Sequence, residues 1–318
     1  MPTKEDLKYF QSMPLDIKVA MTKTRIREWV NHFGESGTYI SFSGGKDSTV
    51  LLHLVRELYP DIPAVFVNTG LEYPEIQSFV KSFDNVKVLY PKMPFTEVIR
   101  KYGYPFISKN VSQDVWEART YENCLRTRSK FDPDSEYNQK YGTKFSQVRW
   151  KALLETDFKI SHMCCKIMKK SPAKKYEKSE DRTPIVGTLA EESQLRTTQW
   201  LKNGCNAFEA TRNISQPMSF WTESDVLQYI HENNIQIASV YGEIIHDEPQ
   251  LNMLEDVPCK CRMSGCDRTG CIFCGFGAHL KEESRFKRLK ETHPKQYNYC
   301  IGGENMTLTD CGFQVRAA

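Results

Sequence analysis

The chain has 318 residues, of which 40% are hydrophobic and 26% are charged, and its formal net charge at pH 7 is +3. A chain of this length can bury a substantial core, either as one large α/β domain with an appended module or as two domains. The nearly balanced charge excludes a protein that coats polyanions with its whole surface, so a nucleic-acid role would need local patches.

No membrane segment or signal peptide is indicated. The N-terminal residues lack an apolar core, and no stretch approaches the about 18 uninterrupted apolar residues of a membrane span. We therefore expect a cytoplasmic protein that does not engage a membrane. In such a protein, 11 cysteines indicate metal ligation or catalysis rather than disulfides.

The first part of the chain predicts strands that alternate with helices. Apolar residues at helical spacing predict a helix over residues 17–33, and the pattern then predicts a strand over 38–42 and a helix over 48–58. Buried strands are predicted at 63–67 and 86–90, with a helix from Pro74 to about Phe83 between them. This alternation predicts an α/β fold with a Rossmann-like, doubly wound parallel sheet.

The second part predicts a helical insertion over one sheet edge, at about residues 105–160, and a fourth strand over 183–187. A helix is predicted over 221–233, with Thr222 as its N-cap and Asp225 at its third position.

The composition changes after Pro249 into a cysteine-rich stretch, which precedes a charged helix predicted from about Ala278 to Thr292. We therefore expect a nucleotide-binding domain over residues 1–245 and a cysteine-rich, metal-binding and helical module over 246–318.

Seven residues that run from the end of the first predicted strand into its helix have the composition of a phosphate loop: Ser43, Gly44, Gly45, Lys46, Asp47, Ser48 and Thr49. Paired glycines let backbone amides approach anionic oxygens, and the helix offers its positive N-terminal end. Lys46 adds a cation, and the hydroxyls add donors. Because an acid repels phosphate unless a divalent cation lies between them, we assign Asp47 a role with Mg²⁺. An ordinary tight turn before an amphipathic helix is the alternative.

The segment Ser43-Gly44-Gly45-Lys46-Asp47-Ser48 resembles the loop of the PP-loop ATP pyrophosphatases, which cleave ATP between its α and β phosphates. The stretch from Val67 to Glu75 resembles the phosphoadenylyl sulfate (PAPS) reductase branch of that superfamily, although Asn68 stands where an Asp is common. The resemblance implies an adenine nucleotide alpha hydrolase-like fold that binds ATP, PAPS or adenylyl sulfate (APS). It adds four residues to the nucleotide-binding set: Asn68, Thr69, Gly70 and Glu72.

The segment from Gly187 to Arg196 resembles the substrate loop of the same branch, although Leu189 stands where an arginine is usual. This resemblance implies that Gly187, Glu192 and Ser193 bind the nucleotide. Arg196 would then stabilise the developing charge while Lys46 holds the phosphates.

Five cysteines lie within sixteen residues: Cys259, Cys261, Cys266, Cys271 and Cys274. The two-residue spacing between Cys271 and Cys274 lets both sulfurs reach one metal. Separately, Cys164 and Cys165 precede several lysines, which favour thiolates.

The combination of paired cysteines with a later Cys-x-x-Cys resembles the APS reductases, which hold a four-iron cluster, and the sulfur-inserting enzymes of DNA phosphorothioation. It implies an iron–sulfur cluster of the [4Fe–4S] type held by four of five residues: Cys164, Cys165, Cys266, Cys271 and Cys274. A structural Zn²⁺ site is the alternative to the iron–sulfur cluster. Cys259 and Cys261 would bind a separate metal or no metal.

Three hypotheses follow. The first is an ATP-dependent sulfurtransferase that adenylates an acceptor, releases pyrophosphate and inserts sulfur, because the reductases generally lack an intact lysine-bearing loop. The second is a thiol-dependent PAPS or APS reductase that releases sulfite, for which Cys311 is the candidate nucleophile. The third is a zinc-stabilised protein that binds nucleic acid or a partner without turnover.

The sulfur donor would be a cysteine desulfurase or a reduced thiol protein. A nucleic acid is one candidate acceptor, because two basic segments, at residues 126–130 and 166–178, could meet its backbone. The acceptor, the donor and the oligomeric state are not specified by the sequence.

Overall fold

The computed structural model describes residues 2–142, 145–246, 261–280 and 285–301. The chain folds into two compact units, each assembled from separate segments of the sequence. The first unit comprises Met1–Asn68, Glu72–Leu89 and Ala173–Thr269, and the second comprises Thr69–Leu71, Tyr90–Pro172 and Gly270–Ala318. The predicted module boundary near residue 245 adjoins residues outside the described ranges and stays a prediction.

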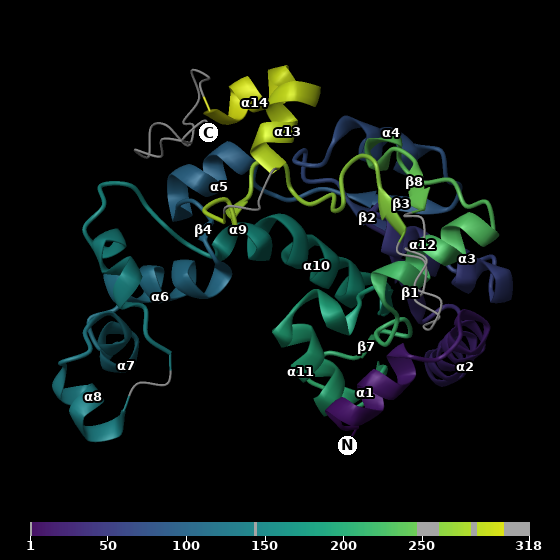
Figure 1. Cartoon of the computed structure of the whole chain (residues 1–318), viewed down its shortest axis with the longest axis horizontal. Helices are drawn as coiled ribbons and strands as arrows, with labels where there is room; N and C mark the ends of the chain where they lie inside the picture. Colours follow the sequence, from purple (N-terminus) through teal and green to yellow (C-terminus); the bar gives the residue numbers. More distant parts are fainter. Residues whose placement is uncertain (1, 143–144, 247–260, 281–284, 302–318) are drawn as a thin grey trace, which may run out of the picture. The chain divides into compact units, whose positions relative to one another are not determined.

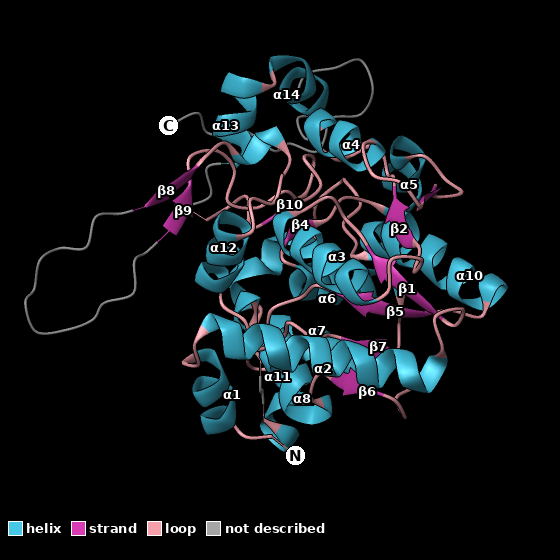
Figure 2. Ribbon diagram, turned by 90° about the vertical axis from the view of Figure 1, so that its right-hand side faces the viewer, coloured by secondary structure: helices cyan, strands magenta, loops and turns pink. Residues whose placement is uncertain are grey.

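The first unit contains a six-stranded sheet in the order β3-β2-β1-β5-β7-β6 (Figures 1 and 2). Its strands are β1 (Thr38–Ser41), β2 (Ala64–Val67), β3 (Val86–Leu89), β5 (Thr183–Val186), β6 (Asn206–Ala207) and β7 (Ile214–Ser215). All neighbouring pairs are parallel except β6 with β7. The predicted α/β class with a parallel sheet is therefore confirmed, with one antiparallel edge strand that the sequence pattern did not indicate.

The helices of this unit are α1 (Lys4–Gln11), α2 (Leu15–Phe33), α3 (Lys46–Leu58), α4 (Pro74–Lys81), α11 (Gln194–Asn203) and α12 (Glu223–Glu232), with most of α10 (Ser171–Glu180). Four of them, α2, α3, α4 and α12, lie where the sequence predicts them, whereas α1, α10 and α11 were not predicted. Helix α3 buries Val50, Leu51, Leu54 and Val55 completely, because their spacing places them on one helix face. Short elements complete the unit: η4 (Ala190–Glu192), η5 (Ser239–Tyr241), β8 (Ile244–His246) and β9 (Cys261–Met263).

A buried ion pair joins α2 to α12. The Lys18 ammonium lies 2.7 Å from the Asp225 carboxylate and also donates to the Gln11 carbonyl at 2.7 Å. Asp225 belongs to the capping box of α12, in which Thr222 is the N-cap, as the sequence predicts. One carboxylate therefore caps a helix and neutralises a buried lysine.

The second unit is mainly helical. Its elements before the paired cysteines are α5 (Phe95–Tyr102), β4 (Phe106–Ile107), α6 (Lys109–Thr120), α7 (Leu125–Arg128), η1 (Ser129–Phe131), α8 (Glu136–Tyr141) and η2 (Val148–Leu154). The elements that follow are α9 (Met163–Cys165), a π-helical turn (Lys166–Lys170), β10 (Gly275–Phe276), α13 (Arg285–Thr292) and α14 (Pro294–Ile301). Strand β10 pairs in parallel with β4, which joins the C-terminal segment to the residue 105–160 region.

The predicted start of the charged helix is wrong. Residues 277–280 form a turn, in which Gly277 has a φ of 80° and Leu280 donates its backbone N–H to the Gly277 carbonyl at 2.9 Å. The chain therefore turns at residues 278–280 instead of entering the predicted helix there, and the described helix α13 is Arg285–Thr292.

Within the described ranges, no helix combines the length and the apolar character that crossing a bilayer requires.

Candidate functional site

Three adjacent parallel strands of the first unit end at the same edge of the sheet. The phosphate loop (residues 43–49) follows β1, Asn68 follows β2, and Gly187 follows β5, and the strand order is β2-β1-β5. Ligands of open α/β sheets bind beyond the carboxyl ends of such strands. The fold therefore brings the predicted loops of this unit to the expected edge.

The two glycines of the phosphate loop have different tasks. Gly44 has a φ of 73°, and a Cβ there would lie 2.8 Å from a methyl carbon of Ile76 and of Val80, so α4 leaves no room for a side chain. Gly45 is the N-cap of α3 and lies against Tyr241, since a Cβ at Gly45 would come within 3.3 Å of the tyrosine hydroxyl. The loop is therefore shaped by close backbone packing.

The hydroxyls of the loop mainly hold the loop itself. Ser48 and Thr49 donate to the Gly45 carbonyl at 2.9 and 3.0 Å, while the Ser43 and Ser48 hydroxyls lie 3.0 Å apart. Ser43 is exposed, whereas Ser48 and Thr49 are buried. Ser43 is thus the hydroxyl of the loop that is best placed to meet a ligand.

Lys46 is a buried cation that protein oxygens already satisfy. Lys46 is 3% exposed, and its ammonium donates to the Asp267 carbonyl at 2.8 Å. The Glu223 carboxylate lies 3.0 Å from the same ammonium. The Lys46 backbone N–H donates to the Tyr241 hydroxyl at 3.1 Å. Burial lowers the pKa of Lys46, but the charges of Asp47 and Glu223 outweigh burial and leave the pKa above its ordinary value. Lys46 therefore stays charged at neutral pH.

Asp47 follows Lys46 in the chain. The pKa of the Asp47 carboxyl lies above its ordinary value, chiefly because burial disfavours the carboxylate. Lys46, Arg268 and Arg196 oppose that rise, while the Glu223 charge adds to it. A divalent cation at this carboxylate would favour its charged form. The role of Asp47 with Mg²⁺ stays a prediction.

The segment after β2 shows backbone contacts and a turn. Asn68 donates its backbone N–H to the Leu89 carbonyl at 2.8 Å, and Glu72 is 8% exposed. Thr69 and Gly70 belong to the second unit, where the Thr69 hydroxyl accepts from the Leu71 N–H at 3.2 Å and Gly70 has a φ of 74°. Nucleotide contacts by Asn68, Thr69, Gly70 and Glu72 stay predictions.

Gly187 lets β5 approach the phosphate loop. A Cβ at Gly187 would lie 2.9 Å from the Asp47 carbonyl oxygen and 3.3 Å from the Leu51 Cβ, so a side chain would push α3 away from the sheet edge. The sequence predicted Gly187 as a nucleotide-binding residue, and the structure adds a packing reason for it.

Glu192 organises the rest of this segment. Its carboxylate accepts from the Leu189 N–H at 3.0 Å, forms an ion pair with Arg196 and lies 3.8 Å from Arg268. Ser193 is the N-cap of α11 and accepts from the Arg196 N–H at 3.3 Å. Burial, and then the neighbouring Arg268, lower the pKa of Arg196.

The sequence did not single out four residues that contact this site: Glu223, Tyr241, Asp267 and Arg268. In the sequence, Glu223 is marked only by its place at the start of the helix predicted over 221–233, and no pattern marks Tyr241. Asp267 and Arg268 lie between Cys266 and Cys271, and their place beside the candidate metal ligands obscured a role at the phosphate loop. Only the fold brings Glu223, Tyr241 and Asp267 back to Lys46.

Removing the carboxylate that competes for Lys46 should tighten anion binding. We expect Glu223→Gln to strengthen the binding of inorganic pyrophosphate by about fivefold, because a half-exposed ion pair is worth up to about 1 kcal/mol. Titration calorimetry would measure this affinity, with the exposed Glu180→Gln as a control that leaves it unchanged. Unchanged or weaker binding in Glu223→Gln would contradict the assignment of Lys46 to the anion.

Four of the five candidate metal ligands gather in the second unit. Burial raises the pKa of Cys164, and the neighbouring Cys165, Cys271 and Cys274 raise it further. Cys274 also has a raised pKa, mainly through burial, with Cys165 contributing. The four thiols are therefore close enough to influence one another electrostatically.

These thiols do not form a ready metal cage. In the part of the chain that the structure describes, no group of three or more His, Cys, Asp or Glu side chains is arranged to hold a metal ion. Cys266 is buried in the first unit, where its N–H donates to the Val240 carbonyl at 3.0 Å. Cys261 lies half-buried on β9. Cys259 and Cys311 lie outside the described residues.

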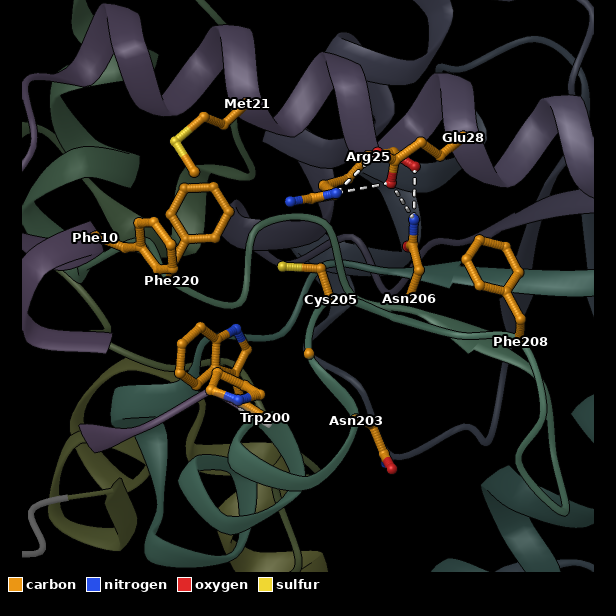
Figure 3. Close-up of a pocket in the computed structure, with 12 residues that line it drawn as sticks. Phe10, Met21, Arg25, Glu28, Trp200, Asn203, Cys205, Asn206, Phe208 and Phe220 are labelled. Carbon is orange, nitrogen blue, oxygen red and sulfur yellow. Dashed lines mark hydrogen bonds and ion pairs between the residues drawn. The ribbon is translucent and has the colours of Figure 1, made fainter. Parts of the chain in front are cut away.

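A separate cavity of about 310 Å³ lies in the first unit (Figure 3). Its walls include Phe10, Phe220 and Trp200, and the Cys205 thiol points toward them (Figure 3). Burial raises the pKa of Cys205, so this thiol is a poor nucleophile. None of the predicted nucleotide or metal residues lines this cavity.

Comparison with known proteins gives a consistent result. Residues 37–108 and 111–275 match the family model of the phosphoadenosine phosphosulfate reductase domain. An uncharacterized protein of Methanocaldococcus jannaschii is 26% identical over 259 residues, which are 81% of this chain and 45% of that protein. The chain thus spans less than half the length of that relative.

The chain is also similar to two proteins whose names describe them as sulfonucleotide reductases. The adenosine 5'-phosphosulfate reductase of Staphylococcus epidermidis is 24% identical over 295 residues, which are 91% of this chain and 86% of the reductase. A crystal structure of the phosphoadenylyl-sulfate reductase from Candida auris aligns with a TM-score of 0.40 at 13% identity, covering 75% of this chain and 91% of that one.

Proposed function

Because the chain belongs to the phosphoadenosine phosphosulfate reductase domain family, we propose that it is an ATP-dependent sulfurtransferase that activates its acceptor at the phosphate loop. The observation that carries this proposal is the buried, charged Lys46 at the first turn of α3, beside Asp47 and next to two glycines that permit close backbone approach. Such a loop is suited to an anionic nucleotide.

The first step is adenylation. An oxygen of the acceptor attacks the α-phosphorus of ATP, the bond between the α-phosphorus and the bridging oxygen to the β-phosphate breaks, and pyrophosphate leaves with that electron pair. The acceptor hydroxyl loses its proton to solvent. Lys46 and Arg196 neutralise charge on the phosphates, and Mg²⁺ near Asp47 would do the same.

The second step is sulfur transfer. Sulfide attacks the activated carbon of the acceptor, and AMP leaves with the oxygen that ATP activated. When the terminal sulfur of a donor-protein persulfide attacks instead, the acceptor is left in a disulfide with the donor. A thiol of a reduced thiol protein then attacks the donor's sulfur, which releases the acceptor thiol and leaves a protein disulfide. The acceptor thereby exchanges one oxygen for one sulfur without net oxidation when sulfide is the donor. A cysteine desulfurase or a reduced thiol protein would be a suitable partner, and a nucleic acid is one candidate acceptor.

Four thiols support an iron–sulfur cofactor in the second unit. Burial raises the pKa of Cys164, the charges of Cys165, Cys271 and Cys274 raise it further, and Lys169 opposes the rise by favouring the thiolate. Thiolates are the usual ligands of iron–sulfur clusters, and a [4Fe–4S] centre bound there would supply labile sulfide or electrons. The described residues hold no ready metal geometry, so no step is assigned to this centre.

The experiment is anaerobic purification followed by iron and zinc analysis and an assay for pyrophosphate release from ATP with sulfide and candidate acceptors. We expect iron, together with acceptor-dependent pyrophosphate release. Cys164→Ser and Cys271→Ser should lose iron, whereas Cys205→Ser, a partly buried cysteine of the first unit, should retain it.

The same assay tests the other two hypotheses. The similarity to an adenosine 5'-phosphosulfate reductase over 86% of that protein favours a reductase as the second candidate. Sulfite release from APS or PAPS with a thiol, without pyrophosphate release from ATP, would select it. Zinc in place of iron, with nucleotide binding and no turnover, would indicate a binding protein.

A further inference from the structure

The segment Cys266–Thr269 lies against the phosphate loop, and one of its residues presents a loosely paired positive charge. We propose that Arg268 is a phosphate-binding residue of this site, and that its ligand is the polyphosphate of a nucleoside triphosphate or pyrophosphate itself. The identity of the ligand rests on the proposed function, whereas the placement of Arg268 rests on contacts within the first unit.

Contacts on both sides of Arg268 fix its backbone. The Asp267 carbonyl accepts from the Lys46 ammonium at 2.8 Å, and the Thr269 hydroxyl lies 2.6 Å from the Tyr241 hydroxyl. Tyr241 in turn accepts from the Lys46 N–H at 3.1 Å. Arg268 is therefore held between two anchors, each of which reaches Lys46 at the first turn of α3.

The Arg268 side chain is loosely held. Its guanidinium lies 3.8 Å from the Glu192 carboxylate, and the side chain is 62% exposed. By contrast, Arg196 pairs with the same carboxylate and is about half as exposed. A long, exposed ion pair contributes little, so Arg268 can leave Glu192 for a stronger anion.

The charge of Arg268 reaches the groups at the phosphate loop. Burial raises the pKa of Asp47 and of Glu191, and the charge of Arg268 opposes both rises. Burial also lowers the pKa of Arg196, and repulsion from Arg268 lowers it further. Leu189, in the same segment as Glu192, is 2% exposed and offers no charge. A guanidinium binds two phosphate oxygens at once, which makes Arg268 a suitable partner for a polyphosphate.

The test measures the binding of Mg²⁺-ATP, inorganic pyrophosphate and adenosine to the full chain and to three variants. We expect Arg268→Gln to weaken ATP and pyrophosphate by about tenfold to a hundredfold, because one charge-assisted contact is lost. Arg268→Lys should retain part of the affinity, and adenosine should bind all variants equally. The exposed Arg27→Gln, on α2 of the same unit, is the matched control and should bind like the unsubstituted chain.

The outcomes separate the two proposals. If the unsubstituted chain binds ATP and Arg268→Gln binds it equally well, the assignment of Arg268 is wrong and the proposed function stands. Equal losses in Arg268→Gln and Arg27→Gln would also overturn the assignment, because they would reflect net charge alone. If the unsubstituted chain binds neither ATP nor pyrophosphate, both proposals fail.

Discussion

Lys46→Gln should lower the rate of pyrophosphate release from ATP by about a hundredfold to a thousandfold, the effect of removing one donor that stabilises developing charge. Lys46 is the buried ammonium at the start of α3, and its charge is sustained by Asp47 and Glu223. Glutamine keeps much of the side-chain length but supplies no charge. The rate is measured by a coupled pyrophosphate assay at saturating Mg²⁺-ATP and acceptor.

The substitution should leave the fold intact, because Glu223, which loses its ion-pair partner, is 44% exposed and remains solvated, and Asp47 keeps the charges of Arg196 and Arg268 nearby. Lys202→Gln, at an exposed position of α11, is the control and should keep the full rate. If Lys46→Gln releases pyrophosphate at the same rate as the unsubstituted chain, the phosphate loop does not take part in the reaction.

Lys18→Met should lower the free energy of unfolding by about 3–5 kcal/mol, the effect of breaking a buried ion pair from one side. Lys18 is 2% exposed and lies 2.7 Å from Asp225, whose carboxylate would remain buried without its cation. Asp225 would keep its bonds to Thr222, so α12 should still form. Urea unfolding followed by circular dichroism measures the change.

The matched control for this prediction lies on the same helix. Lys23 pairs with Glu57 at 3.0 Å, but both side chains are partly exposed, at 25% and 40%. Lys23→Met should therefore change the free energy of unfolding by no more than about 1 kcal/mol. Similar losses in the two variants would mean that burial does not distinguish the two pairs.

Features that depend on neighbours in the sequence were predicted well. The glycine pair between a short apolar run and an amphipathic stretch predicted the turn that joins β1 to α3, and Thr222 with Asp225 predicted the start of α12. Both arise because turn geometry and helix capping are satisfied within a few residues. The predicted start of the charged helix near Ala278 was wrong, because residues 277–280 form a turn closed by the Leu280 N–H and the Gly277 carbonyl, which the charged composition beyond it does not reveal.

The partners of Lys46 could not be predicted, because they come from residues about 180 to 220 positions away in the chain. Tyr241, Asp267 and Glu223 bond to Lys46 or lie against it only after the chain has returned to the edge of the sheet. No periodicity marks such residues. Arg268 was hidden for the same reason, since its charge acts on Asp47 through space.

The sequence by itself determined the α/β class and the turn between β1 and α3, and it predicted a phosphate-binding role for that turn and a set of metal ligands, because each follows from local spacing and side-chain chemistry. Only the tertiary structure decided which charges surround Lys46 and which thiols share one unit. It grouped Cys164 and Cys165 with Cys271 and Cys274, and it placed Cys266 in the other unit. Long-range contacts are set by packing of the whole chain, and one sequence does not encode them in any short pattern.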